Sequence, residues 1–278
     1  MQLISHRWLD PLNKDFQYTE SSKEAFENLL ERWFWLEFDV NISKDLIPFV
    51  FHDDWLNRIS EWKDNKKFSD MEWADIENYE LPNGCHFTSF DNLLELIEKK
   101  QKAWLQSALH LKSKFQSKDL LDILVKYIWK YPNITQKIFI FDVKIDTAKY
   151  LKNKIPNIQL FFSVSHKYDK ERFNGFVWWT LYTVEEAIRN KDLVDWVRLD
   201  EWDRKDIDGT KKLYTAKIIN QFKDLWLKTV IISPELHAKS PGLLWWESHD
   251  DVENNEKLKR RIEEIKSLNP DFICSDYL

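Results

Sequence analysis

Cysteine and glycine are scarce in this chain of 278 residues, which contains two cysteines and four glycines. The two cysteines, Cys85 and Cys274, lie far apart and in no metal-binding spacing, so we expect no disulfide framework, and a reducing cytoplasm fits this usage. No long apolar run follows the start at Met1-Gln2-Leu3-Ile4. We therefore expect no secretory signal and no transmembrane segment, and we expect a cytoplasmic protein.

A surplus of basic residues is also missing. Lysine and arginine number 41 against 47 aspartate and glutamate residues, which gives a formal net charge of −6 at pH 7. Binding to nucleic acid needs a basic face, so we expect no nucleic acid as the main partner. A local basic pocket for one phosphate group is compatible with this balance.

Tryptophan, in contrast, is abundant, with 15 residues. The interpretation we favour is bulk in the core and between helices. The alternative is an aromatic wall that binds a sugar or a quaternary ammonium group.

Short apolar runs alternate with longer amphipathic segments along the whole chain. Eight runs are predicted to be strands: Leu3–Ser5, Trp35–Val40, Ala108–Lys112, Lys137–Asp142, Leu160–Val164, Trp196–Leu199, Thr229–Ser233 and Phe272–Ser275. Alternation of strands and helices implies a parallel sheet. Eight such units in a chain of this length favour a single-domain (β/α)8 TIM barrel over an open, doubly wound sheet.

Helical stripes and start signals occupy the segments between these strands. The stripes are Ala25, Phe26, Leu29, Leu30 and Trp33; Leu120, Leu121, Leu124, Val125 and Ile128; and Leu258, Ile262, Ile265 and Leu268. Ser21–Glu24 and Thr183–Glu186 are typical of capping boxes. A short extra strand at Ile47–Phe51 is followed by a polar, tryptophan-rich stretch. We expect this excursion, at about residues 54–87, to pass over the mouth of the barrel.

Glu37 and Asp39 are two apart in a predicted strand, so their side chains point to the same face. Two carboxylates on one face repel unless a cation joins them, and Mg²⁺ or Ca²⁺ is the natural partner. An exposed acidic face is the alternative. The alternating apolar residues of the run Trp35–Val40 favour the metal site.

Histidines and basic residues follow other predicted strands, where the active site of such a barrel lies. His6 and His52 both follow apolar runs, which favours general acid–base chemistry over two structural histidines. Arg7 and Lys112 would then meet an anionic group. A solvated lysine at the start of a helix is an equally good interpretation of Lys112.

Five segments together resemble the glycerophosphodiester phosphodiesterase family. Ser5-His6-Arg7-Trp8 resembles its His-Arg-Gly opening, Ser21–Glu27 its first helix, and Leu36–Val40 its Glu-x-Asp metal strand. Phe49–Arg58 is similar to its His-Asp motif with the Leu and Arg that follow, and Pro270–Tyr277 to its closing strand. The resemblance implies a (β/α)8 barrel, a divalent metal ion and attack on a phosphodiester. It implies His6 and His52 as catalytic residues, Glu37 and Asp39 as metal ligands, and Arg7 as a phosphate contact.

The chain departs from this family at two positions. Trp8 stands where the family has glycine, and His110-Leu111-Lys112 stands where the family has Glu-x-Lys on the third strand. Lysine is kept, but an imidazole replaces the carboxylate. His110 is therefore a candidate third metal ligand, and it makes Mn²⁺ or Zn²⁺ possible beside Mg²⁺ or Ca²⁺.

The middle and C-terminal segments are similar to a branch found among bacterial surface-polysaccharide genes. These segments are Phe141-Asp142, Trp196–Trp202 and Ser233-Pro234-Glu235-Leu236-His237. This resemblance implies a glycan- or sugar-linked phosphodiester as substrate, with Glu235 and His237 in substrate binding.

The function predicted from the sequence is metal-dependent hydrolysis of a glycerophosphodiester or a sugar-linked phosphodiester by histidine acid–base chemistry. The alternative from another class is a non-catalytic barrel with a degenerate metal site that binds a phosphorylated glycan. An amidohydrolase is less favoured, because those barrels carry His-x-His on the first strand and this chain has none. The sequence leaves the oligomeric state open.

Overall fold

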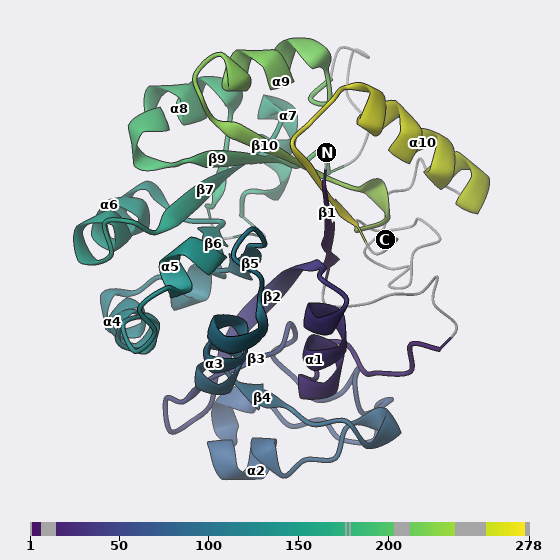
Figure 1. The fold of residues 1–278 in the computed structure, drawn as a ribbon, viewed down its shortest axis with the longest axis vertical. Helices are drawn as coiled ribbons and strands as arrows, with labels where there is room; N and C mark the ends of the chain where they lie inside the picture. Colours follow the sequence, from purple (N-terminus) through teal and green to yellow (C-terminus); the bar gives the residue numbers. More distant parts are fainter. Residues whose placement is uncertain are drawn as a thin grey trace. The chain divides into compact units, whose positions relative to one another are not determined.

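The computed structural model describes residues 2–6, 15–175, 177, 179–202, 212–236 and 254–275 (Figure 1). The chain divides into two compact units, one of residues 5–139 and the other of residues 1–4 and 140–278. Two strands, β1 (Gln2–Ser5) and β6 (Ile138–Phe141), contain residues of both units. Among the described helices, none combines the length and the apolar composition that crossing a bilayer requires.

The unit of residues 5–139 is built around a four-stranded sheet in the order β5-β2-β3-β4. Its main elements are α1 (Lys23–Glu31), β2 (Trp35–Ile42), β3 (Pro48–Val50), β4 (Thr88–Ser89), α3 (Phe90–Lys100), β5 (Ser107–His110), α4 (Lys118–Ile128) and α5 (Ile134–Lys137). β2 pairs in parallel with β5 and antiparallel with β3, and β3 pairs antiparallel with β4. α1 packs on β2 and on α3, so helices that adjoin these strands in the sequence also pack against them.

The excursion between β3 and β4 is a packed segment with its own core. It contains the short helices η2 (Phe68–Asp70), α2 (Trp73–Glu77) and η3 (Pro82–Gly84). The core residues are Phe49, Phe51, Leu56, Phe68, Met71, Ile76, Leu81, Cys85 and Phe87, all buried. The ring of Phe51 lies edge-on to those of Phe68 and Phe87, with centroids 5.5 and 5.2 Å apart. The position of this excursion over the barrel mouth stays a prediction.

The other unit carries the parallel strands β7, β9, β10 and β11, which pair in that order. Its elements beyond β6 are α6 (Ile145–Lys154), β7 (Gln159–Val164), α7 (Lys167–Phe173), β8 (Leu181–Tyr182), α8 (Val184–Arg189), η5 (Lys191–Leu193), β9 (Trp196–Leu199), α9 (Ala216–Lys223), β10 (Lys228–Ile232), η6 (Pro234–Leu236), α10 (Asn255–Ser267) and β11 (Phe272–Ser275). The two-residue β8 pairs in parallel with β7. Strand–helix alternation therefore continues through this unit.

All eight strands predicted from apolar runs are confirmed, two of them with the predicted bounds (Trp196–Leu199 and Phe272–Ser275) and six with shifted ends. The third ends at His110, so Lys112 follows the strand instead of belonging to it. The fourth begins at Ile138, because Lys137 closes the short helix α5 that intervenes after Pro132. The extra strand is confirmed at Pro48–Val50. The two-residue strands β4 and β8 were not predicted, because two residues are too few to show a periodic pattern.

The predicted start of the first helix is shifted by one residue. Ser22, not Ser21, is the N-cap, and its hydroxyl accepts from the backbone N–H of Ala25. Glu24 closes no capping box; its carboxylate instead accepts from the backbone of His86. The capping box at Thr183–Glu186 is confirmed.

The helical stripes are confirmed in part. Ala25, Phe26, Leu29 and Leu30 are buried on α1, and Leu121, Leu124, Val125 and Ile128 are buried on α4. Trp33 is wrong as a stripe member, because it lies beyond the end of α1 and is 55% exposed. The helix ends at Glu31, so the helical spacing of the stripe no longer applies at Trp33.

The interpretation of tryptophan as core bulk is wrong for most of the described tryptophans. Trp35 and Trp196 are buried, whereas Trp33, Trp55, Trp62, Trp104, Trp129, Trp179 and Trp226 are exposed. Four of the exposed residues, namely Trp33, Trp62, Trp179 and Trp226, have a left-handed backbone with φ between 64° and 70°. Glycine usually occupies such turn positions, which face solvent. In this glycine-poor chain, tryptophan fills them.

Candidate metal and catalytic site

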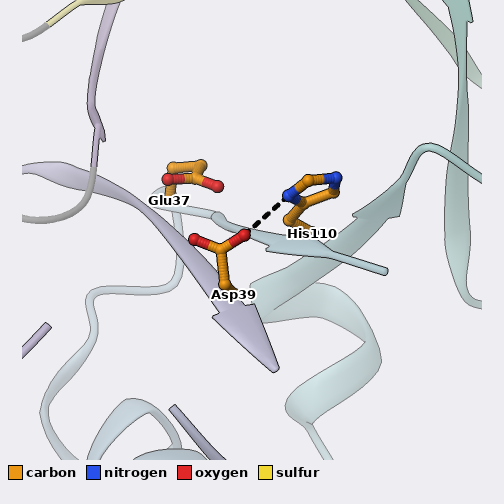
Figure 2. A group of neighbouring side chains, drawn as sticks. All are labelled: Glu37, Asp39 and His110. Atoms are coloured by element: carbon orange, nitrogen blue, oxygen red, sulfur yellow. Dashed lines mark hydrogen bonds and ion pairs between the residues drawn. The ribbon is translucent and has the colours of Figure 1, made fainter. Parts of the chain in front are cut away.

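Three potential metal ligands meet on two adjacent strands. One ligand atom each from Glu37, Asp39 and His110 lies within 4.8 Å of the others (Figure 2). Glu37 and Asp39 share a face of β2, as their spacing predicts, and both side chains are buried. The register of β2 with β5 sets Asp39 opposite His110. This register is the local reason why the three side chains converge.

Asp39 is the most constrained member of the cluster. Its Oδ1 lies 2.7 Å from Nδ1 of His110 and 3.7 Å from Nζ of Lys112. Burial alone would raise the pKa of Asp39, but the charges of Lys112 and His52 and the hydrogen bond with His110 outweigh burial. The pKa is therefore well below its ordinary value, and the group is an ionised carboxylate.

The second carboxylate oxygen of Asp39, Oδ2, is buried and has no hydrogen-bond partner among the described residues. A buried charged acceptor without a partner is costly, so this atom is suited to a cation. Glu37 supplies further carboxylate oxygens and His110 an imidazole nitrogen. The donor set therefore fits a divalent metal ion.

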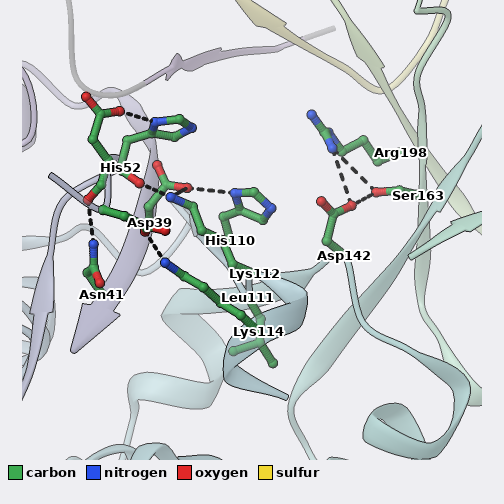
Figure 3. Close-up of polar contacts among 12 residues, drawn as sticks. Asp39, Asn41, His52, His110, Leu111, Lys112, Lys114, Asp142, Ser163 and Arg198 are labelled. Carbon is green, nitrogen blue, oxygen red and sulfur yellow. Dashed lines mark hydrogen bonds and ion pairs between the residues drawn. The ribbon is translucent and has the colours of Figure 1, made fainter. Parts of the chain in front are cut away.

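His52 lies just after β3 and is held by its neighbours (Figure 3). Its Nδ1 is 2.7 Å from Oδ1 of Asp53, and its backbone carbonyl accepts a hydrogen bond from Lys112. Burial raises the pKa of Asp53, but the hydrogen bonds from His52 and Arg58 lower it more, to below the ordinary range. The result is an ionised carboxylate against one side of the imidazole.

The structure thus brings five predicted site residues into one unit around Asp39: Glu37, Asp39, His52, His110 and Lys112. His6 directly follows β1 and is half-buried, and its role stays a prediction. Arg7 and His237 lie outside the described residues.

Glu235, a predicted substrate-binding residue, lies in the other unit. It is fully buried in η6, and its two carboxylate oxygens accept hydrogen bonds from the hydroxyls of Ser233 and Ser275. The role of Glu235 in substrate binding stays a prediction.

Two groups of interacting polar residues were not predicted from the sequence. The first is the pairing of Asp53 with Arg58, whose Nε lies 2.5 Å from Oδ2 of Asp53. The second is Arg198 in β9, whose Nη1 lies 3.4 Å from Oδ1 of Asp142 (Figure 3). The same Nη1 lies 3.5 Å from Oδ2 of Asp200. A lone arginine inside the apolar strand Trp196–Leu199 was the available signal for the second group, because an arginine in a buried strand needs partners.

Solved structures with the same fold cover almost the whole chain. A candidate glycerophosphodiester phosphodiesterase from Galdieria sulphuraria matches with a TM-score of 0.68 at 16% identity, covering 99% of this chain and 94% of that one. A glycerophosphoryl diester phosphodiesterase from Parabacteroides distasonis matches with a TM-score of 0.63 at 19% identity, covering 99% and 82%. A phosphodiesterase from Oleispira antarctica, solved in complex with the product sn-glycerol-3-phosphate, matches with a TM-score of 0.63 at 15% identity, covering 100% and 93%. This likeness confirms the (β/α)8 barrel predicted from the sequence.

The sequence itself supplies the identification. Residues 16–200 match the model of the glycerophosphoryl diester phosphodiesterase family, and the chain belongs to that family. It is therefore an enzyme of the phosphoric diester hydrolase class. A search among curated proteins finds no match.

Proposed function

We propose that the enzyme hydrolyses a glycerophosphodiester or a sugar-linked phosphodiester, using a divalent metal ion and histidine acid–base chemistry. The observation that carries this proposal is the cluster of Glu37, Asp39 and His110, with His52 and Lys112 beside Asp39. Metal ligands, a proton-transfer group and a cation for phosphate are the three components that such a reaction needs.

Glu37, Asp39 and His110 would hold the metal ion. When bound, it neutralises negative charge that develops on a phosphoryl oxygen. The two carboxylates favour Mg²⁺ or Ca²⁺, whereas the imidazole makes Mn²⁺ or Zn²⁺ acceptable as well. Oδ2 of Asp39, which has no hydrogen-bond partner among the described residues, supports a cation at this position.

His52 would transfer a proton at Nε2. An ionised carboxylate can only accept hydrogen bonds, so the ring nitrogen that faces Asp53, Nδ1, carries a hydrogen in the resting state. Nε2 is then the nitrogen that takes a proton from the attacking hydroxyl or gives one to the leaving alcohol. His6 is proposed for the opposite transfer. The attacking hydroxyl is either water or a neighbouring hydroxyl of the substrate, and the latter gives a cyclic phosphate.

Arg7 and Lys112 are proposed to hold the remaining phosphoryl oxygens. An arginine can bind two oxygens at once, whereas a lysine acts as a point charge. Glu235 and His237 are proposed to take part in substrate binding.

Two observations guide the choice of substrate. The structural neighbour from Oleispira antarctica holds sn-glycerol-3-phosphate as its product, so diesters of glycerol phosphate are the first candidates. The likeness of the middle and C-terminal segments to the surface-polysaccharide branch supports a sugar-linked diester. A net charge of −6 provides no long-range attraction for nucleic acid, so we do not propose nucleic acid as a substrate.

A turnover screen tests the proposal. Glycerophosphocholine, glycerophosphoglycerol and a panel of sugar phosphodiesters are incubated with the enzyme and Mg²⁺, Ca²⁺, Mn²⁺ or Zn²⁺, with and without chelator. We expect release of a phosphomonoester or a cyclic phosphate that stops when the chelator is added. Phosphorylated glycans that bind but are never cleaved under any metal condition would favour the non-catalytic alternative.

A further inference from the structure

A chain of charged side chains leads from His52 into the excursion. Asp53 contacts His52 through Oδ1, at 2.7 Å, and Arg58 through Oδ2, at 2.5 Å. The guanidinium of Arg58 also forms an ion pair with Glu20, which lies ahead of α1. The side chains of Asp53, Arg58 and Glu20 are each less than one fifth exposed. Charges that are this shielded from water interact more strongly than surface pairs.

Three further bonds tie the backbone of the same segment to β2 and to Lys112, which follows β5. The backbone N–H of Phe51 donates to the carbonyl of Asp39 at 3.1 Å. The side-chain amide of Asn41 donates to the carbonyl of Asp53 at 2.6 Å, and Lys112 donates to the carbonyl of His52. These bonds fix the backbone of His52 relative to β2. The orientation of its imidazole ring needs a separate constraint.

Arg58 can supply that constraint because it belongs to a packed turn. Leu56, two residues earlier, is fully buried in the excursion core with Phe51 and Phe68. The backbone N–H of Arg58 is itself bonded to Oδ1 of Asn57, at 2.8 Å. The excursion thus presents the guanidinium from a rigid base.

We propose that Arg58 and Glu20 are positioning residues that hold the carboxylate of Asp53 in place. The carboxylate then fixes the ring of His52 with Nδ1 facing Asp53, which leaves Nε2 as the nitrogen that exchanges the proton. The inference rests on the proposed function in one respect, the use of His52 for proton transfer. It assigns a task to the excursion, which secures the geometry of a catalytic group from outside the sheet. A carboxylate that accepts from both sides cannot rotate away from the imidazole without breaking a charge-assisted bond.

Kinetics of matched variants test the proposal. Asp53→Asn and Arg58→Gln should lower kcat by about 10- to 100-fold, the usual loss when a residue that orients an imidazole is removed. KM should change little, because neither side chain is proposed to touch the substrate. Arg58→Lys keeps the charge and should recover part of the loss. Asp54→Asn is the matched control, because Asp54 is the next residue and pairs with Lys114 instead.

A second measurement does not depend on turnover. Nitrogen-15 NMR of the histidine rings in metal-free protein reports which nitrogen of His52 carries the hydrogen, with His52→Ala for assignment. The wild type should show the Nδ1–H form, and Arg58→Gln and Asp53→Asn should show a mixture of both forms. The Asp54→Asn spectrum should match the wild type.

The outcomes separate the two claims. Wild-type kcat together with an unchanged ring spectrum in Arg58→Gln and Asp53→Asn would overturn the positioning role. The role would also be overturned if these variants yielded less folded protein but each folded molecule kept the wild-type kcat. Full activity of His52→Ala would instead overturn the proposed function, while the ring spectra would still decide whether Arg58 and Asp53 orient His52.

Discussion

Asp39 and His110 face each other across two parallel strands, with Nδ1 of the imidazole 2.7 Å from Oδ1 of the carboxylate. In the family motif that the sequence resembles, a carboxylate takes the place of this imidazole. The pair leaves Oδ2 of Asp39 buried without a hydrogen-bond partner among the described residues. We therefore expect the metal preference at the proposed site to depend on His110, and the variant His110→Glu restores the family's carboxylate.

Metal binding should need the carboxylates and should change its selectivity with His110. We expect calorimetry to show one divalent ion bound by the wild type and none by the double variant Glu37→Gln/Asp39→Asn. His110→Glu adds a third oxygen donor, so Ca²⁺ or Mg²⁺ should bind about 10- to 100-fold more tightly than in the wild type. Equal binding by the wild type and the double variant would contradict the site.

Replacement of either of the histidines proposed for proton transfer, His6 and His52, should lower the rate strongly and the stability of the fold only slightly. His6→Ala and His52→Ala should each lower phosphodiester cleavage by about 100- to 10,000-fold, the usual worth of a proton-transfer group. The pH–rate profile of the wild type should rise and then fall. Loss of the base removes the acidic limb and loss of the acid removes the alkaline limb, which assigns the two roles. Full activity in both variants would show that other residues transfer the protons.

The stability contributed by Asp53 should depend on pH. Its pKa in the folded protein lies below the ordinary value because of the bonds from His52 and Arg58. A depressed pKa stabilises the fold above the ordinary carboxyl pKa of about 3.9, and the contribution disappears as the pH falls below that value. The wild type should thus be more stable than Asp53→Asn at pH 7, by about 1 to 3 kcal/mol. Urea unfolding should show this gap shrinking below about pH 4; a constant gap down to pH 2 would contradict the ion-pair origin.

Trp226 should be replaceable by glycine with a gain in stability. Its φ is 64° and its side chain is 93% exposed, so the residue accepts a left-handed backbone and gains little packing. Trp226→Gly should stabilise the fold by up to about 1 kcal/mol, as the relief of backbone strain exceeds the added freedom of the unfolded chain. Trp129 is the matched control, since it is 63% exposed with φ of −68°. Trp129→Gly should lower the Tm, and a lower Tm for Trp226→Gly as well would refute the argument.

The sequence was sufficient for the eight strands expected from apolar runs and for the shared face of Glu37 and Asp39, because period and spacing are local properties. The contact between Asp39 and His110 was not predictable in this detail, since it depends on the register of β2 with β5. The link from Asp53 to Arg58 needed the fold of the excursion, whose core is assembled from residues spread over nearly 40 positions between Phe49 and Phe87. Because the apolar residues of this segment follow no clear helical or strand period, the sequence does not predict that they form a common core.

The core of the excursion also holds Cys85, whose Sγ lies 3.4 Å from the backbone nitrogen of Thr19. The second thiol, Cys274, is in the unit of residues 1–4 and 140–278, and both cysteines are buried and belong to no disulfide. A buried thiol reacts with an alkylating reagent only when the surrounding structure opens. Each of the two units therefore contains one thiol whose alkylation rate reports how often that unit opens. The alkylation rates of Cys85 and Cys274, measured with and without metal ions, would report the opening of the excursion core separately from the opening of the other unit.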